Sequence, residues 1–165
     1  MKNGLEIERK FLVRLPDTDK LNIVKTEIMT QIYLEEVSDN LQRRIRKINC
    51  NGEVTYTYTE KHFITAITRK EMEYNINEKE FERLLSQKRR DTAPVEKKRY
   101  SFEYKNQLFE LDVYPFSDEL AVMEIELKTA QDEISFPENV EIIKEVTSDS
   151  RYANASLATA GCFPE

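Results

Sequence analysis

The 165-residue chain is poor in the residues on which several common kinds of site depend. It has no tryptophan, a single histidine (His62) and two distant cysteines, Cys50 and Cys162. This scarcity argues against histidine-based metal sites and against nucleophiles activated by histidine. Reduced thiols of a cytosolic protein are the simplest interpretation of the two cysteines. No apolar run approaches about 18 residues and the N-terminus lacks a signal-peptide core, so we expect a cytoplasmic protein without a membrane partner.

Glycine and proline are also scarce, with 3 and 5 residues, whereas 34% of the chain is charged and 39% is hydrophobic. This composition is typical of an ordered globule without linkers. The length predicts one domain over residues 1–165. The net charge of −6 argues against a nucleic-acid partner but is compatible with a local basic pocket.

What the chain does have is a series of like-charged pairs two positions apart, separated mostly by apolar residues. The pairs are Glu6 and Glu8, Arg44 and Arg46, Glu71 and Glu73, Lys97 and Arg99, Glu110 and Asp112, and Glu124 and Glu126. In a β-strand the members of such a pair share one face, roughly 7 Å apart. At that distance they repel by about 0.6 kcal/mol even in water. A surface selected only for solubility would mix the signs, so the rows indicate a site for metal cations and a polyanion.

Alternation of apolar and polar residues predicts an α+β fold that is mainly antiparallel β. Eight strands are expected near residues 4–14, 31–36, 41–49, 54–62, 68–76, 95–104, 107–114 and 121–128, and three helices at 18–29, 78–89 and 148–160. Leu21, Val24 and Ile28 would form the buried stripe of the first helix. Asn77 is the expected N-cap of the second, and Gly161 ends the third.

Eight such strands can close into a barrel or form a sandwich. Three amphipathic helices need an apolar surface to pack on, which places the charged residues inside a lumen. The proposed lumen holds eight acidic residues (Glu6, Glu8, Glu71, Glu73, Glu110, Asp112, Glu124, Glu126) and seven basic ones (Lys10, Arg44, Arg46, Lys61, Arg69, Lys97, Arg99). The near balance matters because a semi-enclosed unpaired charge costs several kcal/mol. Arg9, Arg43 and Lys98 have the opposite parity and are expected on the outer face.

Carboxylates without histidine or cysteine prefer hard divalent cations such as Mg²⁺ or Mn²⁺. Rows of arginine and lysine prefer phosphate oxygens. Together the two sets suit a metal-complexed polyphosphate, and phosphoryl transfer needs positioning and charge neutralisation more than a nucleophilic side chain.

The order of these residues also resembles a known family. Glu6-Ile7-Glu8-Arg9-Lys10 is similar to the E-x-E-x-K signature of the CYTH superfamily, the triphosphate tunnel metalloenzymes, which include class IV adenylyl cyclases and thiamine triphosphatases. Further segments follow in the family's order: Gln31-Ile32-Tyr33-Leu34, Arg44-Ile45-Arg46, Lys61, Arg69 to Glu73, Lys97-Lys98-Arg99, Glu110-Leu111-Asp112, Glu124-Ile125-Glu126, and Glu145-Val146-Thr147 with Asp149, Arg151-Tyr152 and Asn154. The similarity spans residues 5–158.

This resemblance implies an eight-stranded antiparallel tunnel, open at both ends, that binds a triphosphate-bearing small molecule with one or two Mg²⁺ or Mn²⁺ ions. By resemblance, the metal ligands would be Glu6, Glu8, Asp112, Glu124 and Glu126. The phosphate contacts would be Lys10, Arg44, Arg46, Lys61, Lys97 and Arg99, with Arg69 beside them and Arg151 reaching in from the last helix. Lys10 and Tyr33 would orient or activate the attacking water.

Three functions remain open at this point. The leading one is a metal-dependent hydrolase of tripolyphosphate or of a nucleoside or thiamine triphosphate. The alternatives are a class IV adenylyl cyclase and a non-catalytic triphosphate sensor. The loop after Lys61 (62–68) is short, which argues against recognition of a bulky nucleoside. The sequence leaves open whether Glu71, Glu73 and Glu110 touch metal, and whether the chain acts as a monomer or a homodimer.

Overall fold

The computed structural model describes residues 2–165, with side chains from residue 4 onward. The described chain forms nine strands, two α-helices and three short 3₁₀ turns. The strands are β1 (Lys2–Arg14), β2 (Asn22–Tyr33), β3 (Leu41–Cys50), β4 (Glu53–Phe63), β5 (Thr68–Ile76), β6 (Val95–Tyr104), β7 (Gln107–Val113), β8 (Leu120–Leu127) and β9 (Ile142–Glu145). The helices are α1 (Glu78–Leu84) and α2 (Asn154–Ala160), and the 3₁₀ turns cover Thr18–Lys20, Leu85–Gln87 and Ser150–Tyr152.

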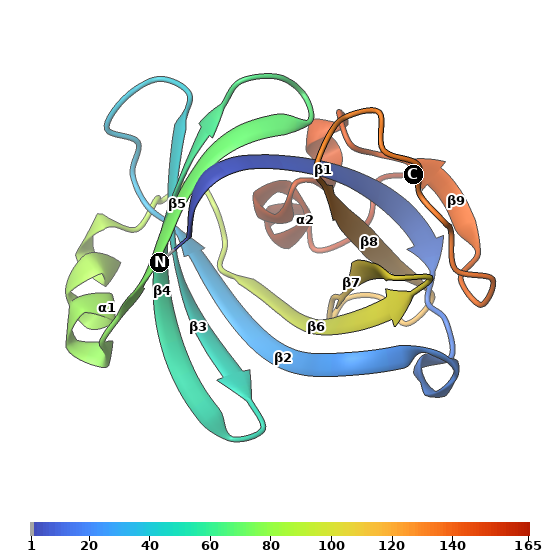
Figure 1. Ribbon diagram of the computed structural model, residues 1–165. Helices are drawn as coiled ribbons and strands as arrows, with labels where there is room; N and C mark the ends of the chain where they lie inside the picture. The colour runs from blue at the N-terminus through green and yellow to red at the C-terminus, as the bar shows by residue number, and fades with distance from the viewer. Residues whose placement is uncertain (1) are drawn as a thin grey trace.

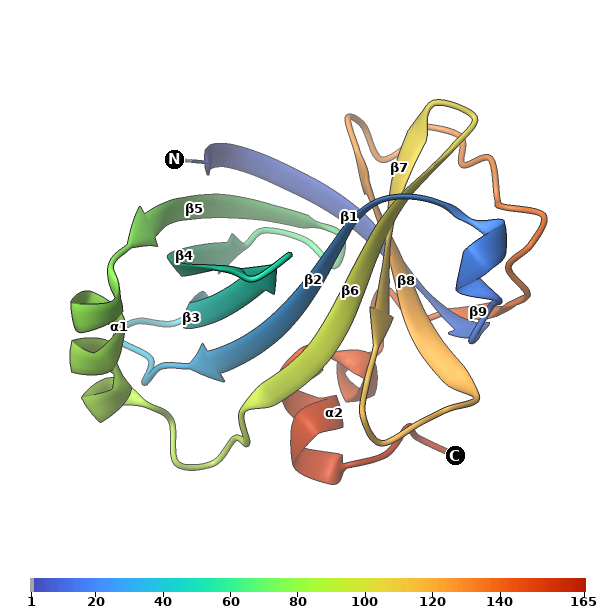
Figure 2. The same cartoon turned by 90° about the horizontal axis from the view of Figure 1, so that it is seen from below.

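Eight of the strands close into an antiparallel barrel, which confirms the predicted fold (Figure 1). The sheet order is β5-β4-β3-β2-β6-β7-β8-β1-β9, and β5 also pairs with β1. The closing strand β1 changes neighbours along its length. It pairs with β5 over Lys2–Ile7 and with β8 over Ile7–Arg14. Figure 2 shows β1 spanning from the β3–β5 side of the barrel to the β6–β8 side.

The helix predicted over residues 18–29 is wrong. Only Thr18–Lys20 make a 3₁₀ turn, and the chain then runs as the long strand β2. The physical reason is the run of β-branched residues from Ile23 to Ile32, which lose χ1 freedom in a helix and pack well on a pleated surface. Val24 and Ile28, the expected buried stripe, are 53% and 59% exposed. The sequence also did not predict strand β9, which pairs with Phe11–Val13 of β1.

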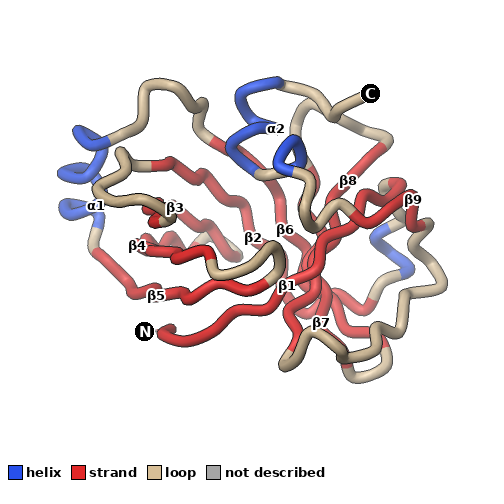
Figure 3. Tube along the Cα trace, turned by 90° about the horizontal axis from the view of Figure 1, so that it is seen from above, coloured by secondary structure: helices blue, strands red, loops and turns tan. Residues whose placement is uncertain are grey.

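The other two predicted helices are confirmed in shortened form. Asn77 accepts a hydrogen bond from the backbone N–H of Glu80 at 2.8 Å and caps α1. Helix α2 ends at Gly161, whose φ of +69° is the left-handed conformation expected there. Figure 3 shows α1 beside β3–β5 and α2 on the β6–β8 side of the barrel. In the described chain, neither helix is long and apolar enough to cross a membrane.

Apolar residues pack on the outside of the barrel, as the parity argument predicted. Phe81 and Leu84 of α1 pack on the outer face of the barrel beside β2–β5. The apolar residues that they meet there are Ile32, Leu34, Ile45 and Tyr58. A second outer cluster lies on β1, β6, β7 and β8 and includes Phe11, Phe102, Phe109, Leu111, Met123 and Ile125. Because both outer faces supply the core, the charged faces of the strands are left to line the interior.

A third apolar cluster lies inside the barrel, next to α2. It joins lumen-facing residues to Tyr152 and Leu157 at the C-terminal end of the chain; the members are Leu12, Tyr33, Val95, Tyr114, Val122, Val146, Tyr152 and Leu157. Helix α2 is visible through the barrel in Figure 1. The lumen is therefore filled at the α2 end, which differs from the implied tunnel open at both ends.

Candidate functional site

The rest of the barrel interior is a charged cavity of about 220 Å³. Of the fifteen charged residues assigned to the lumen, all except Lys97 and Asp112 line it. Its other lining residues are Tyr33, Gln42, Phe63, Ala153 and Asn154. The strands therefore bring together charged residues that are as far as 120 positions apart in the sequence, such as Glu6 and Glu126, as the alternation predicted.

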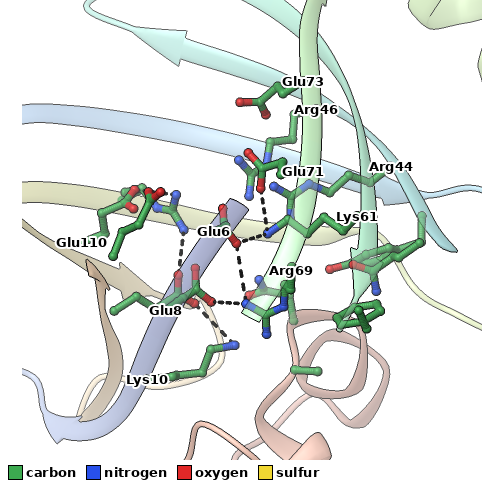
Figure 4. Close-up of a pocket in the computed structure, with 18 residues that line it drawn as sticks. Glu6, Glu8, Lys10, Arg44, Arg46, Lys61, Arg69, Glu71, Glu73 and Glu110 are labelled. Carbon is green, nitrogen blue, oxygen red and sulfur yellow. Dashed lines mark hydrogen bonds and ion pairs between the residues drawn. The ribbon is translucent and has the colours of Figure 1, made fainter. Parts of the chain in front are cut away.

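On one side of the cavity, acidic and basic side chains neutralise one another (Figure 4). The Lys61 ammonium on β4 lies 3.0 Å from Glu6 and 3.3 Å from Glu71. The guanidinium of Arg69 on β5 lies 3.0 Å from Glu8. Each of these charges is more than four-fifths buried, so the pairing offsets much of the desolvation cost of the empty cavity.

Lys97, Arg99 and Asp112 form a second charged group, which is buried more deeply. Asp112 accepts hydrogen bonds from Lys97 at 2.8 Å and from Arg99 at 2.7 and 2.9 Å. Burial would raise the pKa of Asp112, but the two cations hold it well below its usual range. Burial, together with repulsion from Arg99 and Arg46, lowers the pKa of Lys97 to about 7 despite the attraction of Asp112. Asp112 therefore forms ion pairs with two cations and does not line the cavity.

Arg44 and Arg46 on β3 differ from the other lumen bases because neither forms an ion pair with a carboxylate of the described residues. The Glu73 carboxylate attracts Arg46 but forms no ion pair with it. The Arg44 Nε is buried without a hydrogen-bond acceptor. Both side chains are buried, at 6% and 7% exposure. Burial, followed by repulsion from Arg44 and Arg99, lowers the pKa of Arg46 to about 10. Arg46 is still charged at neutral pH, and with Arg44 it forms a concentrated positive site.

Lys10 and Tyr33, the residues expected to act on water, both line the cavity. The Lys10 ammonium lies 3.4 Å from the Glu124 carboxylate. Burial lowers the pKa of Lys10, but Glu124 and Glu8 outweigh it and the net pKa is raised. Lys10 is therefore protonated at neutral pH and can supply charge but cannot accept a proton.

The sequence profile of the CYTH domain family matches residues 4–161.

The chain belongs to the CYTH family.

Solved structures agree with this membership. The inorganic triphosphatase NE1496 is 33% identical and aligns over 93% of this chain and 94% of its own, with a TM-score of 0.56. Two more distant structures share the fold. PH1819 from Pyrococcus horikoshii OT3 is 23% identical over 76% of this chain and 80% of its own, with a TM-score of 0.56. HpAC1 from Hippeastrum, an adenylyl cyclase candidate with a dominant triphosphatase activity, is 15% identical over 74% and 80%, with a TM-score of 0.52. The search of curated proteins gives no match.

In this CYTH domain, strands β1, β7 and β8 carry opposed carboxylates. Glu8 pairs with Glu126 across β1 and β8, and Glu110 pairs with Glu124 across β7 and β8. All four line the cavity. Like charges directly opposite one another destabilise a sheet. Burial raises the pKa of Glu110, and the negative charges of Glu124 and Asp112 raise it further, against the opposing effect of the Arg99 cation. Such a donor set fits a hard divalent cation, although the described side chains hold no preformed cluster of three or more ligands.

The expected metal ligands are thus divided by the structure. Glu8, Glu124 and Glu126 lie in this acidic region, together with Glu110, whose role the sequence left open. Glu6 instead lies between Lys61 and Arg69. Asp112 lies behind the cavity wall in its pair with Lys97 and Arg99. The carboxylates that face one another and the cavity are the better candidates for a metal.

Arg151 does not lie where the resemblance placed it. Its side chain is 58% exposed, pairs with Asp149 at 2.6 Å, and does not line the cavity. The residue of this segment that reaches the site is Asn154, which contacts Tyr114 and lies 3.4 Å from the Lys97 ammonium. Gln31 also contacts the site, through Arg46 and Tyr33, and the sequence signal for this placement is the parity that it shares with Tyr33 on β2.

Proposed function

We propose that this CYTH protein is a divalent-metal-dependent triphosphatase that hydrolyses the terminal phosphoanhydride of a triphosphate. The observation that supports the proposal is the pair Arg44 and Arg46, two buried guanidinium groups in the cavity that form no ion pair with a carboxylate of the described residues. The other cavity bases already have carboxylate partners. The net positive charge at the pair is therefore available to a ligand anion, and guanidinium groups bind phosphate oxygens in bidentate fashion.

The size and lining of the cavity favour inorganic tripolyphosphate over a nucleoside triphosphate. The cavity volume of about 220 Å³ is below the roughly 300–1,000 Å³ typical of pockets for drug-sized ligands. Tyr33 and Phe63 are the aromatic residues of the described lining, which otherwise consists mainly of charged side chains. NE1496, an inorganic triphosphatase with 33% identity, supports the same choice.

The reaction needs little covalent chemistry from the protein. A water oxygen forms a bond to the terminal phosphorus, the bond to the bridging oxygen breaks, and its electron pair leaves with pyrophosphate. The two protons of the water are shared between the products. Arg44 and Arg46 would hold the non-reacting phosphates, and Lys10 would add positive charge where negative charge accumulates.

A divalent ion held by Glu8, Glu110, Glu124 and Glu126 would neutralise phosphate charge and polarise the reacting phosphoryl group. The proposal assigns Glu6 and Asp112 to organising the basic residues instead. Lys61, Arg69 and Arg99 then balance the acidic rows and are available to exchange partners when substrate enters, whereas Lys97 stays paired with Asp112 behind the cavity wall.

A substrate panel tests this proposal. The protein is incubated with Mg²⁺ or Mn²⁺ and tripolyphosphate, ATP or thiamine triphosphate, and the products are identified. Orthophosphate with pyrophosphate from tripolyphosphate, faster than orthophosphate from ATP, is the expected result. Cyclic AMP with pyrophosphate from ATP would replace the proposal by a class IV cyclase. Tight binding without turnover of any compound would replace it by a sensor.

A further inference from the structure

Gln31 connects two of the residues assigned to the site, Arg46 and Tyr33, through hydrogen bonds. It lies on β2, opposite Arg46 of β3 and two residues before Tyr33. Its side chain is fully buried at 0% exposure. Arg46 Nε donates a hydrogen bond to Gln31 Oε1 at 2.6 Å, and Gln31 Nε2 donates to the Tyr33 hydroxyl oxygen at 2.6 Å.

The orientation of the Gln31 amide follows from its partners. Arg46 Nε can only donate, so the amide atom that faces it must be the oxygen. The NH₂ group then faces Tyr33, and the phenol oxygen must act as the acceptor. Turning the amide by 180° would place two N–H donors against each other. The Gln31 orientation therefore dictates what the tyrosine hydroxyl can do.

Tyr33 has one proton to donate, and this proton cannot go to Gln31. Because Tyr33 lines the cavity, a substrate phosphate oxygen or the attacking water can accept this proton when substrate is bound. Arg46 is affected as well, since its Nε is engaged by Gln31 and its two Nη groups are left for phosphate. The buried Gln31 amide thus fixes the direction in which the Tyr33 hydroxyl donates and the Nη groups of Arg46 that remain for phosphate.

We propose that Gln31 is a positioning residue of the triphosphatase site, which aims the Nη groups of Arg46 at phosphate and makes Tyr33 a hydrogen-bond donor toward the substrate. The inference rests on the proposed function and adds to it that Tyr33 donates and does not serve as a base.

The test compares Gln31 variants with Tyr33→Phe. Gln31→Met keeps the length of the side chain and removes both hydrogen bonds. Gln31→Glu keeps the shape but presents two acceptors, so it attracts the Tyr33 proton and neutralises Arg46. The matched control is Thr57→Val. Thr57 lies opposite Arg46 on β4, is buried, and its hydroxyl makes no hydrogen bond in the described structure, so this variant should retain wild-type kinetics.

We expect kcat for tripolyphosphate with Mg²⁺ to fall roughly 10²-fold in Gln31→Met and in Tyr33→Phe, the usual scale for a lost proton-transfer or orienting partner. Gln31→Glu should show the same loss in kcat and, because Arg46 is neutralised, a KM raised about tenfold or more. In the double variant Tyr33→Phe with Gln31→Met, kcat should be within about threefold of the Tyr33→Phe value, because Gln31 acts on kcat through the hydroxyl that is already missing.

The outcomes separate this inference from the proposed function. A wild-type protein that neither binds nor hydrolyses tripolyphosphate overturns the proposed function, and the role of Gln31 with it. An active wild type combined with wild-type kinetics in Gln31→Met overturns the role of Gln31 alone. Losses that multiply in the double variant also overturn it, since they describe general damage. If Gln31→Met does not fold, the isosteric Gln31→Glu decides through the same kcat and KM comparison.

Discussion

Replacing Arg44 by methionine should stabilise the empty protein while it abolishes anion binding. Arg44 and Arg46 share one face of β3, roughly 7 Å apart, and at an effective dielectric constant of about 20 they repel by about 2.4 kcal/mol. The buried Arg44 Nε also lacks an acceptor, a defect that costs roughly 1–3 kcal/mol. Methionine keeps most of the apolar stem, and it removes both penalties at the expense of some packing. We expect a net gain of about 1–3 kcal/mol.

Thermal unfolding in phosphate-free buffer of low ionic strength measures this gain. For a protein of this size, about 2–4 °C of Tm corresponds to 1 kcal/mol, so the Arg44→Met variant should melt several degrees above the wild type. Tripolyphosphate should then reverse the order. At about 1,000 times its Kd a ligand adds about 4.1 kcal/mol to the wild type, which exceeds the gain expected from Arg44→Met, and it should add almost nothing to the variant.

Arg99→Met is the matched control, because Arg99 is a lumen arginine with partners. It contacts Asp112 at 2.7 Å and Glu110 at 2.6 Å, and removing it leaves buried carboxylates short of a cation. Loss of one partner from a buried pair typically costs about 3–5 kcal/mol. The two variants should therefore shift stability in opposite directions. If Arg44→Met lowers Tm as much as Arg99→Met does, Arg44 has a counter-ion in solution and the anion-site argument is wrong.

Three further predictions follow from the site. Tyr33→Phe should lower kcat for tripolyphosphate roughly 10²-fold with KM nearly unchanged, because it removes one hydroxyl that orients the reacting groups; an unchanged kcat would make the tyrosine a structural residue. Glu124→Gln and Glu126→Gln should abolish most activity and raise the Mg²⁺ concentration needed for half-maximal rate, while the variants still fold; wild-type rates at low Mg²⁺ would remove both residues from the metal site. Asp112→Asn should destabilise the protein by about 3–5 kcal/mol at pH 7. Because the cations hold the pKa of Asp112 below its unfolded value, the stability that Asp112 contributes is present above about pH 4 and is lost as the pH falls further. Urea unfolding should therefore show a smaller stability deficit of Asp112→Asn at pH 3 than at pH 7. A deficit that does not change with pH would contradict the assignment.

Much of the barrel could be predicted because its signal has a period of two residues. Arg44 and Arg46, with Ile45 between them, indicate which face of the strand is charged and which is apolar. In the structure the two arginines line the cavity and Ile45 packs in the outer cluster. The strand prediction missed β2 over residues 22–30 because Leu21, Val24 and Ile28 also fit a helical stripe. A short window cannot separate the two periods, and the outcome was decided by the pairing of β2 with β3 and β6.

The membership of the site was predictable, but the partnerships inside it were not. Parity places Asp112 in the lumen, yet only the three-dimensional register shows that Lys97 and Arg99 enclose it away from the cavity. Parity likewise cannot distinguish Arg44, which lacks a counter-ion, from Arg99, which has two or more. These differences depend on the position of a residue along the barrel axis, and the alternating pattern carries no information about that position.

The most direct test of the account is a ³¹P NMR time course of tripolyphosphate with Mg²⁺ and the wild-type protein, repeated with the Arg44→Met variant. The account predicts that the wild type forms pyrophosphate and orthophosphate in equal amounts, that no product appears without Mg²⁺, and that the folded variant is inactive. Wild-type protein that leaves tripolyphosphate intact, or an Arg44→Met variant that hydrolyses it at the wild-type rate, would contradict the central claim that this cavity binds and cleaves triphosphates.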